Sequence, residues 1–363
     1  MTLNFDPHPN ANPRSAQERA AILANPGFGT RFTDHMAVAT WTLTDGWHDA
    51  AVLPYGPFQL DPAAAILHYA QGVFEGLKAY RHDDGSIWLF RAEANAARFR
   101  RSAVRLGLPE LPDEDFLGSI EALVRADHDW VPDAAGGEAS LYLRPFMFAS
   151  EAFLGVRASH RVTYSLIASP AGAYFASGVK PVSIWITTKW SRAGAGGTGA
   201  AKCGGNYASS LIAQKEAADQ GCAQVLFADA GSHQFVEELG GMNVWFVSGN
   251  QLVTPALTGS ILEGVTRASI LTLAAERGLE PVERQIKLSE LLGGIADGTI
   301  TEVFACGTAA VITPIGAFKD EDGHEYVVAG GDVGVHTAGL RASLLDIQYG
   351  RAADTHGWMT RIY

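Results

Sequence analysis

A single lysine, Lys202, lies inside a glycine-rich stretch that runs from Arg192 to Ser210 with the sequence RAGAGGTGAAKCGGNYASS. Its small neighbours leave room for a bulky group beside the amine. A lysine shielded from water more readily becomes the neutral amine, which can attack a carbonyl group. The stretch therefore makes Lys202 a candidate Schiff-base lysine, whereas an ordinary lysine on a loop is simply solvated.

Phosphate-binding loops are an alternative reading of the same glycines. Gly194, Gly196 and Gly199 have the GxGxxG spacing of a dinucleotide-binding fingerprint. That fingerprint needs its third glycine in the first turn of a helix, but here a helix can begin only near Asn206. A P-loop needs Ser or Thr after its lysine, and Cys203 follows instead. A dinucleotide-binding dehydrogenase stays the alternative from a different class.

The elements that must position this lysine alternate along the chain. Helical periodicity predicts helices at 92–107, 113–127, 207–221 and 263–278. Runs typical of strands occur at 85–90, 140–148, 182–189, 223–229 and 302–315. This order predicts a mixed α/β or α+β fold.

A break in the periodicity predicts where the chain divides. Small residues, Gly and Pro gather at 168–181, which is typical of a connection between domains. We expect an N-terminal domain at 1–172, an interdomain linker at 173–181, and a C-terminal domain at 182–363 that carries Lys202.

Composition excludes several classes of protein. With 363 residues, of which 47% are hydrophobic and 18% charged, the chain can bury a sizeable core. It has no apolar run long enough to span a membrane, and its first residues lack the pattern of a signal peptide, so we expect a cytoplasmic protein. The net charge of -12, with Arg100-Arg101 as the longest basic run, argues against nucleic-acid binding.

The cysteines predict no covalent framework. Cys203, Cys222 and Cys306 are odd in number, widely spaced and free of any CxxC pair. Neither a disulfide framework nor a zinc site is expected from this pattern, and no other metal site is predicted.

Eight stretches, taken together and in order, resemble one enzyme family. They are FGTRFTDHM (28–36), LHYAQGVFEGLKAY (67–80), SLYLRPF (140–146), SPAGAYF (169–175), AKCGGNYASS (201–210), EELGGMN (237–243), EVFACGTAAVITP (302–314) and THGWM (355–359). The chain resembles the branched-chain amino acid aminotransferases, which are class IV aminotransferases using pyridoxal 5'-phosphate (PLP). The resemblance implies fold type IV, with a smaller N-terminal α/β domain and a larger C-terminal domain that has a β-barrel-like core.

The resemblance implies roles around the cofactor ring. Lys202 would bind PLP covalently and then, as a freed amine, move a proton between the substrate carbon and the cofactor. Glu238, rather than Glu237, would face the pyridine nitrogen and keep it protonated. Tyr207 would hydrogen-bond the 3-oxygen of the ring.

The resemblance also implies a phosphate site. Arg98 would supply positive charge, and Thr308 would supply a hydroxyl. The stretch ILEGVTRAS would begin a helix, so that the amides of Val265 and Thr266 point at the phosphate. Glu263 stands where this family is expected to have proline, and we expect its side chain to turn away from the anion.

Substrate roles follow from the same resemblance. An apolar pocket for the side chains of Leu, Ile and Val would be walled by Phe28, Tyr69, Phe74 and Tyr142. Arg144 and the Tyr142 hydroxyl would bind the distal carboxylate of glutamate, and the amide of Ala309 would bind the substrate carboxylate. Val156 would come from the partner subunit of a homodimer.

The implied reaction moves the amino group of L-leucine, L-isoleucine or L-valine to 2-oxoglutarate by a ping-pong route. A D-amino acid aminotransferase or a lyase similar to aminodeoxychorismate lyase is the alternative within the fold. YLRP (142–145) and GTAA (307–310) favour the branched-chain enzyme. The family's CxxC redox pair after GTA is not matched, so no thiol switch is expected.

Overall fold

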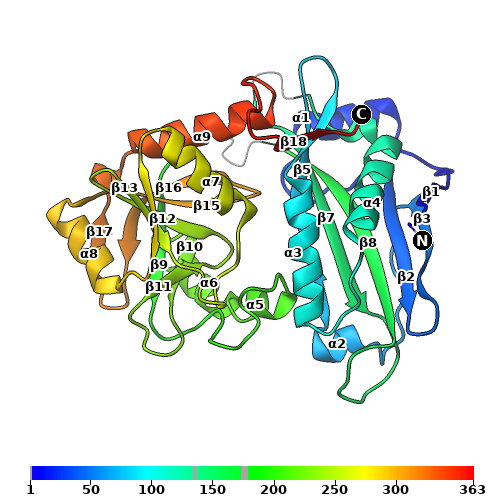
Figure 1. The fold of residues 1–363 in the computed structure, drawn as a ribbon, viewed down its shortest axis with the longest axis horizontal. Coiled ribbons are helices and arrows are strands. Elements are labelled where there is room, and N and C mark those ends of the chain that lie inside the picture. The colour runs from blue at the N-terminus through cyan, green and yellow to red at the C-terminus, as the bar shows by residue number, and fades with distance from the viewer. Residues whose placement is uncertain (1, 134–136, 173–178) are drawn as a thin grey trace. The chain divides into compact units, whose positions relative to one another are not determined.

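The computed structural model describes residues 2–133, 137–172 and 179–363 (Figure 1). The chain divides into two compact units, which are described separately below. Unit 1 comprises Met1–Ala176, Ala201–Gly204 and Asp346–Tyr363, and unit 2 comprises Ser177–Ala200 and Gly205–Leu345.

Unit 1 is built on a nine-stranded sheet with the order β1-β3-β2-β8-β7-β5-β6-β18, in which β4 also pairs with β7. Its strands are β1 (Asp6–Pro7), β2 (His35–Thr42), β3 (Gly46–Pro54), β4 (Gly72–Phe74), β5 (Leu77–Arg81), β6 (Ile87–Phe90), β7 (Ser140–Ala149), β8 (Arg161–Ala171) and β18 (Met359–Arg361). Its helices include α1 (Ala16–Ala24), α2 (Ala65–Tyr69), α3 (Ala92–Arg105), α4 (Asp113–Ala126) and the 3-10 helix η1 (His128–Trp130). All pairings in this sheet are antiparallel except that of β1 with β3.

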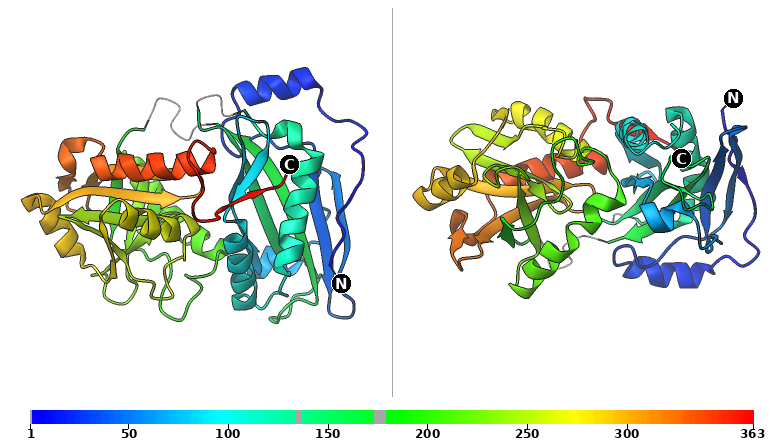
Figure 2. Two further views of the ribbon diagram at one scale, coloured as in Figure 1. Left: turned by 45° about the horizontal axis from the view of Figure 1, so that its top comes forward. Right: turned by 90° about the horizontal axis from the view of Figure 1, so that it is seen from below.

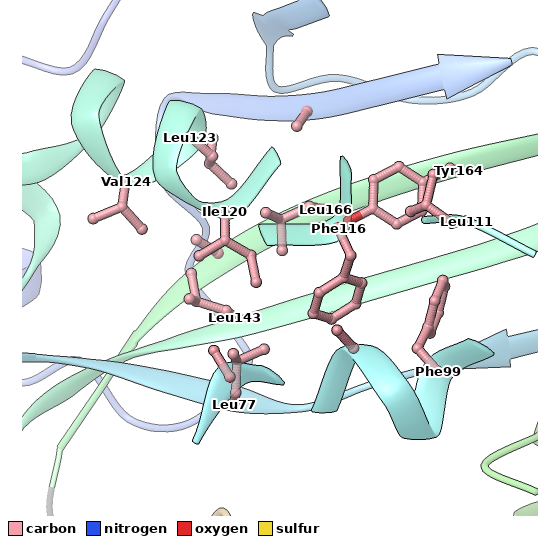
Figure 3. Close-up of a cluster of buried hydrophobic side chains, with 14 of the residues drawn as sticks. Leu77, Phe99, Leu111, Phe116, Ile120, Leu123, Val124, Leu143, Tyr164 and Leu166 are labelled. Atoms are coloured by element: carbon pink, nitrogen blue, oxygen red, sulfur yellow. The ribbon is translucent and has the colours of Figure 1, made fainter. Parts of the chain in front are cut away.

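Helices α3 and α4 lie side by side across one face of this sheet (Figure 1). The core between them and the strands contains Phe99 of α3, Phe116 and Ile120 of α4, Leu143 of β7 and Tyr164 of β8 (Figure 3). Each of these side chains is shielded from solvent, and burying an aromatic or aliphatic side chain of this size stabilises the fold by about 1.5–3 kcal/mol. This packing fixes the position of α3 against the sheet.

The same helix also buries polar side chains. Asn95, Arg98 and Ser102 follow one another at intervals of three and four residues, so they share one face of α3. All three are buried, which requires polar partners inside the unit. This polar stripe is where the candidate site of unit 1 begins.

Unit 2 contains a second nine-stranded sheet with the order β11-β10-β9-β16-β15-β12-β13-β14, in which β17 also pairs with β16. Its strands are β9 (Val182–Thr187), β10 (Gln224–Ala228), β11 (Val236–Leu239), β12 (Asn243–Ser248), β13 (Gln251–Pro255), β14 (Glu280–Arg284), β15 (Ile300–Gly307), β16 (Val311–Lys319) and β17 (Glu325–Val327). Its helices include α5 (Gly204–Ala208), α6 (Leu211–Asp219), α7 (Val265–Glu276), α8 (Leu288–Asp297), the 3-10 helix η2 (Ala329–Gly331) and the first part of α9 (Val335–Gln348).

This second sheet curls back on itself. β11 and β12 are five places apart in the sheet order, yet they are consecutive in the chain and are joined by a hydrogen bond from Leu239 N to Met242 O of 2.9 Å. The strands from β11 to β12 therefore nearly close a barrel, as the resemblance implied. Its interior is filled by apolar side chains that include Leu226, Val244 and Phe318.

One predicted helix is wrong in extent. The segment 207–221 was expected to be a single helix, but α5 ends at Ala208 and α6 begins at Leu211. The Ser209 hydroxyl donates to the carbonyl of Arg192 at 2.8 Å, and the Ser210 hydroxyl donates to that of Tyr207 at 2.7 Å. Because these side chains compete for backbone groups, the helix is interrupted there.

The division into units also differs from the predicted domains at two places. Cys203 forms an isolated antiparallel bridge with Val73 of β4, which attaches 201–204 to unit 1. The C-terminal strand β18, red in Figures 1 and 2, pairs with β6 of unit 1. Unit 1 therefore also contains the C-terminal segment Asp346–Tyr363. Most of the predicted linker 173–181 lies outside the described residues.

Two further expectations concern the chain as a whole. The three cysteines are free and buried. Along the described ranges, no helix has both the length and the apolar character needed to cross a membrane.

Candidate active site

The segment that carries Lys202 is held by unit 1, although the chain on both sides of it belongs to unit 2. The Lys202 amide donates to the Ser102 hydroxyl of α3 at 3.0 Å, and the Phe74 amide donates to the Lys202 carbonyl at 3.0 Å. The amine Nζ lies 4.8 Å from the centroid of the Phe74 ring. Backbone bonds on both sides therefore fix the half-buried lysine between α3 and β4.

The glycines before the lysine serve close backbone packing. A Cβ atom on Gly199 would lie 2.2 Å from the carbonyl oxygen of Ser260, so only glycine fits there. Gly196 has a φ of +72°, which side chains rarely adopt. No helix begins at Gly199, since α5 starts five residues later at Gly204. The dinucleotide-binding alternative is therefore wrong, because its third glycine must open a helix.

Arg98 of α3 is held by an acid that the sequence analysis did not single out. The Arg98 guanidinium donates from Nε to Glu75 Oε1 at 2.6 Å and from Nη2 to Glu75 Oε2 at 2.9 Å. Asn95 Nδ2 donates to Glu75 Oε2 at 2.8 Å. Burial alone would raise the pKa of Glu75, but Arg98, with help from Lys202 and Asn95, holds that pKa below its usual range. An ionised Glu75 thus balances positive charge beside both Arg98 and Lys202.

Aromatic side chains and Arg144 gather around Phe74. The Arg144 guanidinium lies 4.8 Å from the Phe74 ring centroid and donates to the Tyr142 hydroxyl at 2.9 Å. The Phe28 ring meets the Tyr142 ring edge-on at 5.1 Å. A Cβ on Gly76 would lie 2.1 Å from the Tyr142 hydroxyl, so the glycine makes room for that group. Within the described residues, the buried Arg144 Nε has no hydrogen-bond partner, as expected of a group that receives an anionic substrate.

Two further predicted substrate residues belong to α2 and to the loop between β7 and β8. Tyr69, at the end of α2, is 40% exposed, and Val156 is 90% exposed. The Tyr69 hydroxyl donates to the carbonyl of Leu154, which joins α2 to the loop that carries Val156.

In unit 2, Glu238 is buried and held on several sides. Its Oε1 accepts from the Leu262 amide at 2.9 Å, and its Oε2 accepts from Asn243 Nδ2 at 3.3 Å. Arg192 forms an ion pair with Oε1, and both side chains of this pair are buried. The carboxylate of Glu238 is therefore fixed in direction and has a cation beside it.

The neighbouring acid has a different environment. Glu237 accepts a hydrogen bond from the Ser260 hydroxyl, and burial raises the pKa of Glu237. Successive strand residues point to opposite faces, so Glu237 and Glu238 present their carboxyl groups differently. Glu238, which has the cation and the amide donor, suits a permanent negative charge better than Glu237 does.

The start of α7 lies next to the residue that supports Glu238. Gly264 is the N-cap in an extended conformation, so the amides of Val265 and Thr266 fall in the first turn, where the helix itself offers them no acceptor. A Cβ on Gly264 would lie 2.1 Å from Asn243 Oδ1. Asn243 therefore connects the Glu238 carboxylate to a helix start that can bind an anion.

Thr308 and Ala309 form the turn between β15 and β16. Asn243 pairs with Cys306 across β12 and β15, and Gly307 pairs with Val311 to close the turn. Thr308 and Ala309 are half-buried. The register thus places this turn just beyond Asn243, in the same unit as Glu238 and α7.

The remaining predicted residues of unit 2 are Tyr207 and Glu263. Tyr207 is half-buried in the short helix α5. Glu263 is exposed, in keeping with a side chain that turns away from an anion at the start of α7.

The structure adds residues that sequence reasoning missed. Glu75 pairs with Arg98, Gly76 makes room for Tyr142, and Ser102 holds the lysine backbone. In unit 2, Arg192 and Asn243 hold Glu238. One signal was available: Glu75 and Arg192 are charged residues inside stretches that are otherwise apolar or small.

These donor sets fit PLP. Unit 1 supplies a lysine amine and a buried arginine, and unit 2 supplies a fixed carboxylate, a hydroxyl in a tight turn and the amides of a helix start. The lysine amine suits the aldehyde of PLP, and the carboxylate suits its protonated pyridine ring. The arginine, the hydroxyl and the helix amides suit its phosphate dianion.

The chain is similar to known proteins. Residues 72–318 match the class IV amino-transferase family. The chain is 58% identical over 358 residues to a probable branched-chain-amino-acid aminotransferase of Streptomyces coelicolor, which covers 99% of this chain and 98% of the relative. It is 56% identical over 364 residues to the branched-chain-amino-acid aminotransferase of Mycolicibacterium smegmatis, with the same coverage.

A solved structure with the same kind of name as these two relatives has a similar fold. The branched-chain amino acid aminotransferase of Thermobaculum terrenum in its PLP form matches this fold with a TM-score of 0.73 and 26% sequence identity. The match covers 91% of this chain and 98% of that one.

Proposed function

Because this chain belongs to the class IV aminotransferases, we propose that Lys202 is its cofactor-binding lysine and Glu238 the acid that faces the cofactor's ring nitrogen. The cofactor is PLP, and the reaction transfers the amino group of L-leucine, L-isoleucine or L-valine to 2-oxoglutarate, giving branched 2-oxo acids and L-glutamate. The observation that best supports these roles is the fixed position of Lys202 beside the Phe74 ring and the Glu75–Arg98 ion pair.

The residues of unit 1 have different roles around Lys202. When bound, PLP supplies an electron sink for the negative charge that develops on the substrate carbon. The Lys202 amine would bind the cofactor and, once freed, would move a proton from the substrate carbon to the cofactor. Arg98, already oriented by Glu75, binds the phosphate.

The residues of unit 2 serve the same cofactor. Glu238 keeps the ring nitrogen protonated, and Tyr207 hydrogen-bonds the 3-oxygen. The amides of Val265 and Thr266 and the hydroxyl of Thr308 bind the phosphate.

Substrate binding uses an apolar wall and a polar anchor. The wall that accepts branched side chains consists of Phe28, Tyr69, Phe74, Tyr142 and, from the partner subunit, Val156. Arg144 and the Tyr142 hydroxyl bind the distal carboxylate of glutamate, for which the unpartnered Arg144 Nε among the described residues offers a donor. The Ala309 amide binds the carboxylate common to all substrates.

An absorption experiment tests the lysine and both half-reactions together. The purified protein is expected to show a visible band that L-leucine bleaches and 2-oxoglutarate restores. Lys202→Ala should show neither change, while a Lys215→Ala control, which alters an exposed lysine of α6, should behave like the natural protein. A colourless protein that takes up no added PLP would contradict the proposed roles.

We also propose a homodimer, supported by an apolar surface on unit 1. Leu67, Leu154 and Val156 are 60%, 65% and 90% exposed. They belong to one surface, because the Ala65 amide of α2 donates to the Glu151 carbonyl at 3.0 Å. Exposed apolar groups gathered in this way are typical of an interface, and a second copy of this chain would cover them.

The mass of the protein in solution tests the dimer. Val156→Asp should shift sedimentation toward the monomer and lower activity. Val335→Asp is a matched control, since Val335 is 79% exposed and belongs to unit 2, at the start of α9. A Val156→Asp protein that stays dimeric and fully active would remove Val156 from the interface. The cytoplasm remains the proposed location, supported by three free cysteines.

A further inference from the structure

Arg192, the first residue of the glycine-rich stretch, contacts Glu238 but has no role of its own in the proposed function. Its Nη2 donates to the Gly199 carbonyl at 3.0 Å and to the Ser260 carbonyl at 2.9 Å, and it forms the ion pair with Glu238. One guanidinium thus joins three segments: the loop that leads to Lys202, the loop before α7, and β11.

This arrangement is built into the interior of unit 2. Arg192 is 6% exposed and Glu238 is 3% exposed. Removing either partner would leave the other charge in a site with little access to water, which is costly. A guanidinium suits the position, because its Nη2 alone lies within reach of the Glu238 carboxylate and of two backbone carbonyls.

Close packing holds the three segments at fixed distances. Only glycine fits at position 199, because a Cβ atom there would clash with the backbone of Ser260. Ser260 also donates to Glu237 through its hydroxyl. The carbonyls that receive Arg192 therefore cannot move away from Glu238 without disturbing β11.

The charge of Arg192 has a chemical consequence. A cation in contact with a carboxylate favours its ionised form. An ionised Glu238 can accept a hydrogen bond from a protonated ring nitrogen, whereas a neutral carboxylic acid would leave that nitrogen without its counter-charge. Arg192 and the ring nitrogen would then act on the same carboxylate from different directions.

The other charged groups around Glu238 differ in sign and position. The adjacent Glu237 opposes a second negative charge, and its pKa is raised by burial. On β15, the Cys306 thiol has its pKa raised by burial to about 12, so it is neutral at ordinary pH. Arg267 of α7 is paired with Glu283.

We propose that Arg192 is a positioning residue that keeps Glu238 ionised and fixed for the ring nitrogen, and that ties this carboxylate to the loop leading to Lys202. The inference rests on the proposed role of Glu238. It also explains why the glycine-rich stretch opens with an arginine, since that residue closes the loop on itself through Gly199.

Arg192→Met and Arg192→Gln test the charge, and Arg192→Lys tests its rescue. Infrared spectra of the full-length protein without cofactor report whether Glu238 is protonated, once the spectrum of the matching Glu238→Gln variant is subtracted. The natural protein should show an ionised Glu238 at neutral pH. The Met and Gln variants should show a protonated-acid band that disappears when Glu238→Gln is added, and Arg192→Lys should restore the ionised form.

Kinetics provide the second measurement. Arg192→Gln, which retains hydrogen-bond donors for the two carbonyls, should lower kcat at least about tenfold with little change in KM for L-leucine. An ionised Glu238 in both uncharged variants, or a kcat within about twofold of the natural value, would overturn the inference. Arg192→Gln provides the same reading if Arg192→Met does not fold.

Different kinetic results would contradict the proposed role of Glu238 and the proposed role of Arg192. If Glu238→Gln by itself leaves kcat unchanged, the role of Glu238 at the ring nitrogen is wrong. If Glu238→Gln lowers kcat but Arg192→Gln does not, the role of Glu238 stands and only that of Arg192 is lost.

Discussion

Glu75 and Arg98 form a two-pronged ion pair inside unit 1, with N to O distances of 2.6 and 2.9 Å. Glu75 is 0% exposed and Arg98 is 4% exposed. The arginine proposed to bind the cofactor phosphate is thereby oriented before any ligand arrives. The residues on either side of Glu75 also contribute, since Phe74 contacts Lys202 and Arg144, and Gly76 makes room for Tyr142.

Glu75→Gln should weaken the binding of PLP by about tenfold, because a charge-assisted hydrogen bond that orients Arg98 contributes about 1.5–3 kcal/mol. Pyridoxal, which lacks the phosphate, should bind the variant and the natural protein alike. Titration of the cofactor-free protein with each compound, followed by absorbance, measures both affinities. Arg98→Met is the control and should remove the same preference for PLP. Equal weakening for the two compounds would place the effect of Glu75 on the lysine instead of the phosphate.

Tyr142→Phe should act on the dicarboxylic substrate more than on the branched ones. The hydroxyl accepts from Arg144 at 2.9 Å, and its loss would release the proposed anchor of the distal carboxylate. We expect kcat/KM for 2-oxoglutarate to fall about tenfold, and that for the 2-oxo acid of leucine to fall less than about threefold. Steady-state kinetics with both substrates measure the difference, and an equal loss for both would contradict the assignment.

Gly76→Ala tests the space around the same hydroxyl. The added Cβ would lie 2.1 Å from the Tyr142 oxygen, so the tyrosine must move. In the natural background we expect a loss of activity with 2-oxoglutarate. In the Tyr142→Phe background the added loss should be smaller, because the clashing oxygen is already absent. Strictly additive effects would show that Gly76 acts elsewhere.

Gly199→Ala should destabilise unit 2 by about 1–3 kcal/mol, the usual effect of inserting a methyl group into a packed site. The inserted Cβ would meet the Ser260 backbone at 2.2 Å. Thermal unfolding of the two proteins measures the change. Gly205→Ala is the matched control, since a Cβ there meets nothing within 4 Å. An unchanged midpoint for Gly199→Ala would show that the loop can shift without cost.

The His35–Asp127 pair should make stability depend on pH. His35 Nδ1 lies 2.7 Å from Asp127 Oδ1, and the hydrogen bond to Asp127 raises the pKa of His35. A raised folded pKa contributes stability that is fully present below the unfolded value of about 6.5 and is lost as pH rises through the folded value.

Asp127→Asn should therefore lower the unfolding midpoint more at about pH 5.5 than at about pH 9. The variant also alters the bond from the His35 amide to Asp127 Oδ2, but that loss is the same at both pH values. Only the difference between the two pH values reports on the ion pair. Equal shifts at both would show that His35 is not charged in the folded protein.

The family and most of the local structure could be predicted from the sequence. Lys202 among small residues predicted a Schiff-base lysine, and eight stretches in order predicted the family that the comparisons then showed. The helices α3 and α4 were predicted by their periodicity, since amphipathic spacing is a local property. The small residues around Lys202 were expected to leave room for a bulky group, whereas the close approach of Gly199 to the Ser260 backbone was not predicted.

Only the tertiary structure decided which residues hold the functional groups. Glu75 meets Arg98, and Arg192 meets Glu238, through packing between elements that are distant in the chain. The attachment of 201–204 to unit 1 depends on backbone bonds with β4 and α3, and the break after Ala208 depends on serine hydroxyls that find nearby carbonyls. Periodicity reports how a residue faces along its own element. It carries no information about which residue of another element pairs with a buried charge or a free backbone group. Those pairings hold the candidate site residues in place.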